Sequence, residues 1–309
     1  MRSVLLLLAT CVLSAAATLR GTANPDAPAH ASLTPDNPIE LGDVHWGRNL
    51  DEALGLSAKR DKPTLILFQE VPGCANCTRF GQQTLSHPLI VEAIETLFVP
   101  VAIYNNAGGA DAAALRRYGE PAWNNPVVRI VDAAGADLVP RMPDFRSPAQ
   151  VTSGMIAALE GSGHEVPAYL RLVDEELRAE AGGTATATFE TACFWSGEGF
   201  FGEQPDVVGT EAGWQDGAEV VRVAYVVPTG DGDDGAAPVF AKAARRGYRL
   251  VDNGDFAPDR EPKYYLLKSR YAGLPLTGLQ AARVNALIGQ RRSPDALLSP
   301  RQLALLEGK

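Results

Sequence analysis

The sequence predicts two folded units, an α/β unit followed by an α+β unit. A continuous apolar run at 64–68, placed between two helical patterns, is typical of a buried strand in an α/β sheet. Runs at 184–189 and 219–227 alternate instead, which is typical of half-buried strands. The pair Gly182-Gly183 lies between the two patterns as a helix stop, and we place the domain boundary there.

The start of the chain predicts export. Met1-Arg2 supplies a positive charge, and an apolar run from Val4 to Ala17 ends in small residues, as in a secretory signal. We therefore predict a signal peptide at 1–23 and a periplasmic or secreted protein, with an uncleaved anchor as the alternative. Residues 24–43 are rich in Ala, Pro, Thr and Asp and predict a flexible tether.

The first unit, residues 44–160, alternates helical and apolar patterns, and a helical connector at 161–183 follows it. Within the unit, Pro88 predicts a break in the second helical pattern. The predicted helices are 49–60, 77–97 with that break, 110–118 and 147–159. The predicted strands are 64–68, 98–104, 126–131 and a short one at 137–139.

The second unit, residues 184–309, combines the alternating strands with helices near the C-terminus. Thr277 predicts the start of a helix that reaches Gly289, and Ser299-Pro300 opens a last helix. The acidic loop at 231–235 lacks the ligand spacing of an EF-hand, which argues against calcium.

Composition narrows the possible functions. Hydrophobic residues make up 46% of the 309 residues, enough for sizeable cores, so disorder over the whole length is excluded. The formal charge of −9 and the absence of long Lys/Arg runs argue against nucleic-acid binding. Membrane contact is expected only through the signal segment. The 4 cysteines are too few for a disulfide scaffold.

Cys74 and Cys77 follow the 64–68 strand and begin a predicted helix. A helix N-terminus stabilises the thiolate of the first cysteine, and the second lies close enough to displace a mixed disulfide. This arrangement favours a redox-active pair. An inert disulfide is one alternative. Half of a zinc site is another, but it needs two further ligands, for which only His87 and Cys193 are candidates.

With Lys62-Pro63, the 64–68 strand and Cys74-Ala75-Asn76-Cys77, residues 44–160 resemble a thioredoxin-like domain. The resemblance implies a three-layer α/β fold. It also implies a structural role for Pro126, which occupies the place of the proline that faces the active disulfide. Val71-Pro72-Gly73 stands where that superfamily often has a tryptophan before the first cysteine.

Around Cys193, the run Cys193-Phe194-Trp195 with Glu198 resembles the signature of peptide-methionine (S)-S-oxide reductases. The resemblance continues through Ala212-Gly213-Trp214 and Ala218-Glu219-Val220. The resemblance implies a domain with a mixed sheet. The domain is shortened, because the family's central stretch has no counterpart before Phe256.

The resemblance implies that Cys193 is the nucleophile and Glu219 the acid that protonates the sulfoxide oxygen. Phe194, Trp195, Trp214 and Glu198 then form the substrate pocket, with the aromatic rings around the S-methyl group.

Residues 184–309 contain no cysteine besides Cys193, so Cys74 and Cys77 are the expected thiols that recycle it. The sequence thus predicts an exported methionine sulfoxide reductase whose partners are oxidised methionine and an external thiol or disulfide-reductase donor. No metal or organic cofactor is implied.

Two other functions remain open. One is a thiol-disulfide oxidoreductase whose C-terminal domain binds clients without catalysis. The other is a non-enzymatic copper- or client-binding module, for which the 3 methionines are few and scattered.

Overall fold

The computed structural model describes residues 36–143, 147–227, 238–252 and 254–307. The predicted signal peptide, the first part of the tether and the acidic loop at 231–235 lie outside these residues. No helix within the described ranges is both long enough and apolar enough to cross a bilayer.

The first unit is built on a three-stranded sheet in the order β2 (Val99–Tyr104), β1 (Thr64–Gln69) and β3 (Val127–Val131). β1 runs parallel to β2 and antiparallel to β3. Every residue of β1 is buried, as its unbroken apolar sequence predicts for a central strand.

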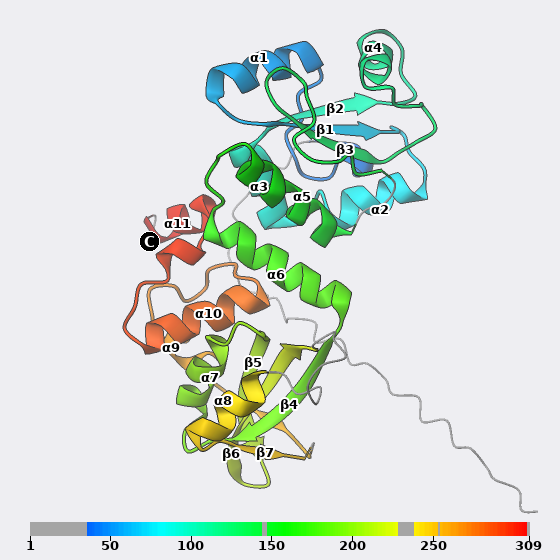
Figure 1. The fold of residues 1–309 in the computed structure, drawn as a ribbon. Helices are drawn as coiled ribbons and strands as arrows, with labels where there is room; N and C mark the ends of the chain where they lie inside the picture. Colours follow the sequence, from blue (N-terminus) through cyan, green and yellow to red (C-terminus); the bar gives the residue numbers. More distant parts are fainter. Residues whose placement is uncertain (1–35, 144–146, 228–237, 253, 308–309) are drawn as a thin grey trace, which may run out of the picture.

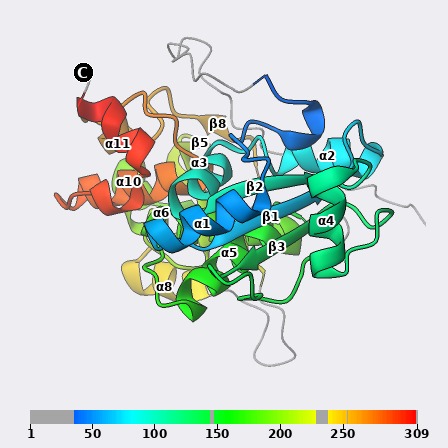
Figure 2. The ribbon, with the colours of Figure 1, turned by 90° about the horizontal axis from the view of Figure 1, so that it is seen from above.

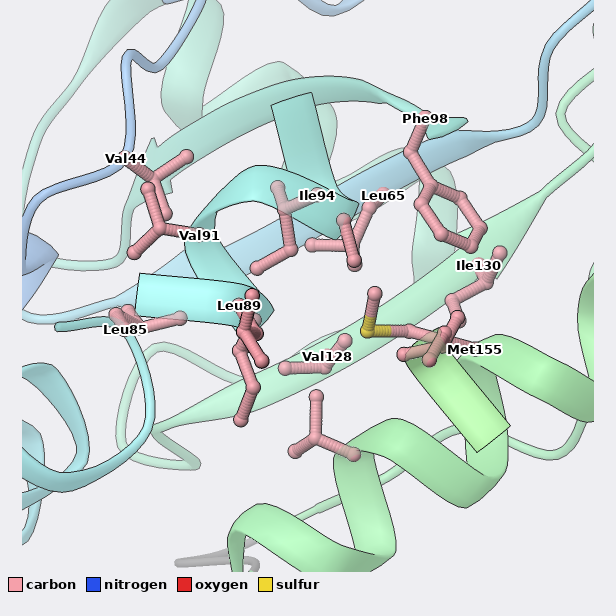
Figure 3. Close-up of a cluster of buried hydrophobic side chains, with 14 of the residues drawn as sticks. Val44, Leu65, Leu85, Leu89, Val91, Ile94, Phe98, Val128, Ile130 and Met155 are labelled. Atoms are coloured by element: carbon pink, nitrogen blue, oxygen red, sulfur yellow. The ribbon is translucent and has the colours of Figure 1, made fainter. Parts of the chain in front are cut away.

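Helices cover both faces of this sheet, so the predicted three-layer α/β fold is confirmed (Figure 1). Leu65 and Leu67 of β1 pack on one face, and Ile66 and Phe68 on the other, because successive side chains of a strand alternate. The first face carries α2 (Ala75–Gln83), α3 (Pro88–Leu97) and α5 (Pro148–Gly161), and the second α1 (Leu50–Arg60) and α4 (Gly109–Tyr118). Figure 3 shows Leu65, Ile94 and Met155 meeting in the first of these cores.

The predicted helix break is confirmed, and the predicted strand at 137–139 is wrong. α3 starts with Pro88 in its first turn and His87 as N-cap, whose Nδ1 accepts the Ile90 N–H at 3.4 Å. Residues 137–139 form only an isolated bridge between Asp137 and Val131. Pro140 has no N–H to donate, so it cannot extend a ladder.

The predicted connector forms a packed helix. α6 (Ala168–Gly182) buries Tyr169, Leu170 and Val173 in the first core. On its other side Glu175 pairs with Arg283 of α10 (Gly278–Gly289) at 2.8 Å. The connector is therefore shared by the two halves of the molecule.

The second unit is an antiparallel sheet with helices against it, which agrees with the predicted α+β class. Its strand order is β7 (Arg249–Val251), β4 (Thr184–Glu190), β6 (Ala218–Val226), β5 (Val207–Gln215) and β8 (Ala257–Pro258). The helices are α7 (Phe194–Gly202), α8 (Pro238–Arg246), α9 (Tyr264–Leu267) and α10.

α7 is held close to α10. A Cβ at Gly202 would lie 2.6 Å from the Ala282 carbonyl oxygen, so only glycine permits this approach. The 3₁₀ turn η2 (Asp295–Leu297) and α11 (Pro300–Glu307) then return toward the first unit, where Arg301 donates its N–H to Glu92 Oε1 at 2.7 Å. Figure 2 shows α10 and α11 on the side opposite to α2.

Candidate functional site

Cys74 and Cys77 lie at the junction between β1 and α2. Cys74 is the exposed N-cap residue of α2, and Cys77, one turn later, has no exposed surface. Their sulfur atoms are 3.4 Å apart and both cysteines are free thiols. This is the arrangement that disulfide exchange needs, with an accessible attacking sulfur and a protected second sulfur beside it.

Asn125 faces the two thiols, and its peptide bond to Pro126 is cis. Asn125 Oδ1 accepts a hydrogen bond from the Cys77 thiol at 2.9 Å and a longer one from the Cys74 thiol at 3.7 Å. Sequence reasoning singled out Pro126 but missed Asn125. The available signal was that Asn125 is the residue directly before that proline.

The two thiols differ in acidity. Burial raises the pKa of the Cys77 thiol to about 11, and its hydrogen bond with Cys74 adds to this shift. Slight burial would also raise the pKa of Cys74, but hydrogen bonds from Cys77 and from the Asn76 backbone outweigh it, so that the pKa of Cys74 lies below its ordinary value. Of the two sulfurs, that of Cys74 is therefore better suited to attack a disulfide, and that of Cys77 to resolve the mixed disulfide.

The position directly before Cys74, Gly73, has no room for a side chain. A Cβ there would lie 2.3 Å from the Glu70 carbonyl oxygen and 2.6 Å from Cys77 Cβ. Its N–H donates to Glu40 Oε1 at 2.8 Å. Glu40 belongs to the 3₁₀ turn η1 (Ile39–Leu41), in which Glu40 and Leu41 are buried. Residues 39–43 are thus part of the folded domain, and the predicted tether ends earlier than residue 43, because Glu40 and Leu41 are buried.

Glu70 is a second residue that sequence reasoning missed. A carboxylate oxygen of Glu70 and the sulfurs of Cys74 and Cys77 all lie within 4.8 Å of one another. Neither His87 nor Cys193, the ligands considered from the sequence, belongs to this group. The spacing of Glu70 from Cys74 gave no signal, because the chain turns between them at the cis peptide Val71–Pro72.

Cys193 lies at an equivalent place in the second unit, as the half-buried N-cap residue of α7. The next residue, Phe194, donates its backbone N–H to Glu219 Oε2 at 2.8 Å. The Glu219 backbone carbonyl also accepts the Thr191 N–H at 3.0 Å. The structure therefore brings the predicted nucleophile and the predicted acid to the same helix N-terminus.

The aromatic residues around Cys193 pack mainly on one another. Phe194 is buried, with its ring centroid 5.2 Å from that of Trp214. Trp195 stacks on Tyr264 at 3.9 Å and donates its indole N–H to Asp259 Oδ2 at 3.0 Å. Trp214 remains 42% exposed, so it is the ring of this group with most surface free for a ligand.

Glu198 does not face a substrate. Its carboxylate is fully buried, 2.8 Å from Lys263 Nζ, and it accepts the Lys263 N–H at 3.0 Å and the Thr210 hydroxyl at 3.4 Å. A buried carboxylate needs this cation and these donors, which leave it no access to a ligand. The predicted substrate contact is corrected to a structural ion pair.

The two cysteine sites are not side by side. Figure 1 places α2 in the upper unit and α7 in the lower unit, with α6 and α10 between them. α7 packs on α10, and Figure 2 shows α10 away from α2 as well. Within this arrangement of one chain, α2 and α7, whose N-cap residues are Cys74 and Cys193, are therefore not neighbours.

Comparison with known proteins bears on the first unit. Residues 45–133 match a family described as thioredoxin-like. These residues form a thioredoxin-like domain. The match does not extend to residues 184–309, so the resemblance of the second unit to methionine sulfoxide reductases stays a prediction.

Solved structures similar to the chain include the following two. One, described as "DsbH Oxidoreductase", is 22% identical, with 41% of this chain and 92% of that chain covered and a TM-score of 0.33. The other, a thioredoxin from Thermus thermophilus, is 23% identical, with 39% and 90% covered and a TM-score of 0.34. No curated protein matches the chain.

Proposed function

We propose that the chain is a thiol-disulfide oxidoreductase that acts through Cys74 and Cys77. The observation that carries the proposal is the unequal pair, with Cys74 exposed at a helix N-terminus and Cys77 buried 3.4 Å away. The Cys74 thiolate attacks a client disulfide, forms a mixed disulfide and releases one client thiolate. Cys77 then loses its proton and attacks the Cys74 sulfur, which releases the second client thiol. The client gains two electrons, and an external dithiol restores the pair.

Reduction of a disulfide-linked polypeptide such as insulin, with dithiothreitol as the external dithiol, tests this function. The wild-type chain should accelerate reduction, and Cys74→Ser should abolish the acceleration. Cys77→Ser should accumulate a mixed disulfide with the client because its resolving thiol is missing. If wild type and Cys74→Ser give the same rate as dithiothreitol alone, the proposal is wrong.

A second function is favoured by the pairing of Cys193 with Glu219 at the start of α7. We propose that Cys193 reduces methionine sulfoxide. The Cys193 thiolate attacks the sulfoxide sulfur while Glu219 delivers a proton to the oxygen, which leaves Cys193 as a sulfenic acid and frees the thioether. Trp214, the most exposed ring of the group, supplies an apolar contact for the S-methyl group.

Recycling of Cys193 would then consume the Cys74/Cys77 dithiol. A thiol of the pair condenses with the sulfenic acid and releases water, and the second thiol completes the Cys74–Cys77 disulfide. Because α6 and α10 separate the two sites, this transfer requires the two units to move apart or a second molecule to dock. Mass spectrometry of a Cys77→Ser chain after oxidation tests it by looking for a Cys193–Cys74 linkage. Mixing unlabelled and isotope-labelled chains distinguishes a linkage within one chain from a linkage between two molecules.

Turnover of a methionine sulfoxide peptide distinguishes the two functions. Cys193→Ser should abolish sulfoxide reduction and leave insulin reduction unchanged, whereas Cys74→Ser/Cys77→Ser should allow one sulfoxide turnover but not many. Insulin reduction without any sulfoxide turnover by the wild type would reject the second function and keep the first.

We also propose that the protein is exported, on the strength of the apolar run that follows Met1-Arg2. An oxidising compartment suits a chain that exchanges disulfides. Fractionation of cells that express the full chain tests this, and recovery of all the protein with cytosolic markers would reject it.

A further inference from the structure

The cluster of Glu70, Cys74 and Cys77 brings together three metal-ligand atoms, an arrangement that disulfide exchange does not require. One carboxylate oxygen and two sulfurs lie within 4.8 Å of one another, and the two sulfurs are 3.4 Å apart. Thiolate sulfur with a carboxylate oxygen is a ligand set that suits zinc. Glu70 follows β1 directly, and Cys74 and Cys77 begin α2, so the backbone of two packed elements positions all three groups.

Asn125 supplies an oxygen to the same place. Its Oδ1 accepts from the Cys77 thiol at 2.9 Å and from the Cys74 thiol at 3.7 Å. A cation that replaces the two thiol protons therefore meets an oxygen already directed at both sulfurs. Together with Glu70 this gives two sulfur and two oxygen ligands, the number that zinc takes in protein sites.

The movement that the two sulfurs require is small. Zn–S bonds of about 2.3 Å in a tetrahedral site place the two sulfurs a few tenths of an ångström farther apart than they are here. Cys74 is exposed, so an ion can enter from solvent on that side. In the disulfide state the sulfurs are bonded to each other and neither is a thiolate, so the ligand set exists only in the reduced protein.

We propose that the reduced pair, with Glu70 and Asn125, binds one zinc ion or a similar borderline-soft divalent cation. The ion displaces the thiol protons to solvent and no electron is transferred. While bound, it holds Cys74 away from client disulfides, so zinc inhibits the proposed exchange reversibly and protects the pair from oxidation. The binding itself does not depend on that exchange function.

The test is zinc competition against a chromophoric chelator, with the full chain reduced and then freed of reductant. The reduced wild type should take up one zinc ion that Cys74→Ser does not, and Glu70→Gln should bind it about tenfold more weakly, as loss of a ligand charge predicts. Glu165→Gln removes an exposed carboxylate away from the cluster and should match the wild type. Cobalt in place of zinc should give a thiolate charge-transfer band that disappears on oxidation.

Equal zinc uptake by wild type and Cys74→Ser would overturn the proposal, because the ion would then bind elsewhere. Equal affinity of Glu70→Gln and wild type would remove Glu70 from the site and leave only an ordinary pair of thiols. Folding of each variant is checked by thermal unfolding. Failure of zinc to bind, with insulin reduction intact, would reject the metal site and keep the exchange function.

Discussion

The unequal acidity of Cys74 and Cys77 predicts a large difference in their reactivity. With a pKa of about 11, only about 10⁻⁴ of Cys77 is thiolate at pH 7, whereas a thiol with the ordinary pKa of 9.0 is about 10⁻² thiolate. The pKa of Cys74 lies below that ordinary value, so its thiolate fraction exceeds that of Cys77 by more than about a hundredfold. Burial of Cys77 adds to the difference by limiting access.

Iodoacetamide labelling of the reduced chain between pH 5 and 10, followed by peptide mass spectrometry, measures both rates. Because a lowered pKa means that the thiolate forms at lower pH, the midpoint of the Cys74 rate profile should lie below pH 9.0, while the Cys77 rate still rises at pH 10. The Cys77 thiol hydrogen bond lowers the pKa of Cys74, so Cys77→Ala should move the Cys74 midpoint upward.

Serine at the same position is the matched control, because its hydroxyl can still donate to Cys74 and should preserve more of the shift than alanine. Equal labelling rates for the two cysteines at pH 7 would refute the reasoning, as would a Cys74 midpoint that Cys77→Ala leaves unchanged.

Three further predictions concern the supports of the two sites, each measured by urea unfolding. Gly73→Ala should lower the free energy of unfolding by about 1–3 kcal/mol and slow Cys74 labelling, because the new Cβ overlaps Cys77. Gly55→Ala, with open space around it in α1, should instead raise the free energy of unfolding by about 0.5–1 kcal/mol. Equal effects of the two substitutions would contradict the packing around Gly73. Lys263→Met should lower the free energy of unfolding by about 3–5 kcal/mol, because it leaves the Glu198 carboxylate buried without its cation. Adding Glu198→Gln should restore most of that stability. If it does not, the lost ion pair is not the reason for the destabilisation. Thr277→Ala removes the capping box of α10 and should cost about 1 kcal/mol, while an unchanged stability would show that water replaces the cap.

Local sequence rules predicted elements of both units. The apolar run of β1, the Pro88 break and the Thr277 cap are each fixed by neighbouring residues, and each is present in the structure. The strand expected at 137–139 did not form because Pro140, which has no N–H to donate, interrupts the pairing with β3. Leu138 still donates its N–H to Ile130, and Met142 pairs again with Val128 beyond the proline.

The candidate sites were predicted only in part. Cys74 and Cys77 were found because their spacing within one helix turn is local. Glu70 and Asn125 reach the same sulfurs from outside that motif, across a turn and from the loop before β3, so no spacing rule indicated them.

Glu198 was assigned to the substrate pocket because it is close to Cys193 in sequence and resembles a family residue. Its actual partner, Lys263, is 65 residues away, and the two form an ion pair in the interior.

Equilibration of the full chain with glutathione buffers of graded redox potential tests the central claim most directly. After an acid quench and labelling of the remaining thiols, mass spectrometry should show one reversible two-electron transition that joins Cys74 to Cys77, and Cys74→Ser should lack it. A pair that stays reduced in every buffer, or a disulfide that reduction cannot reopen, would contradict the account.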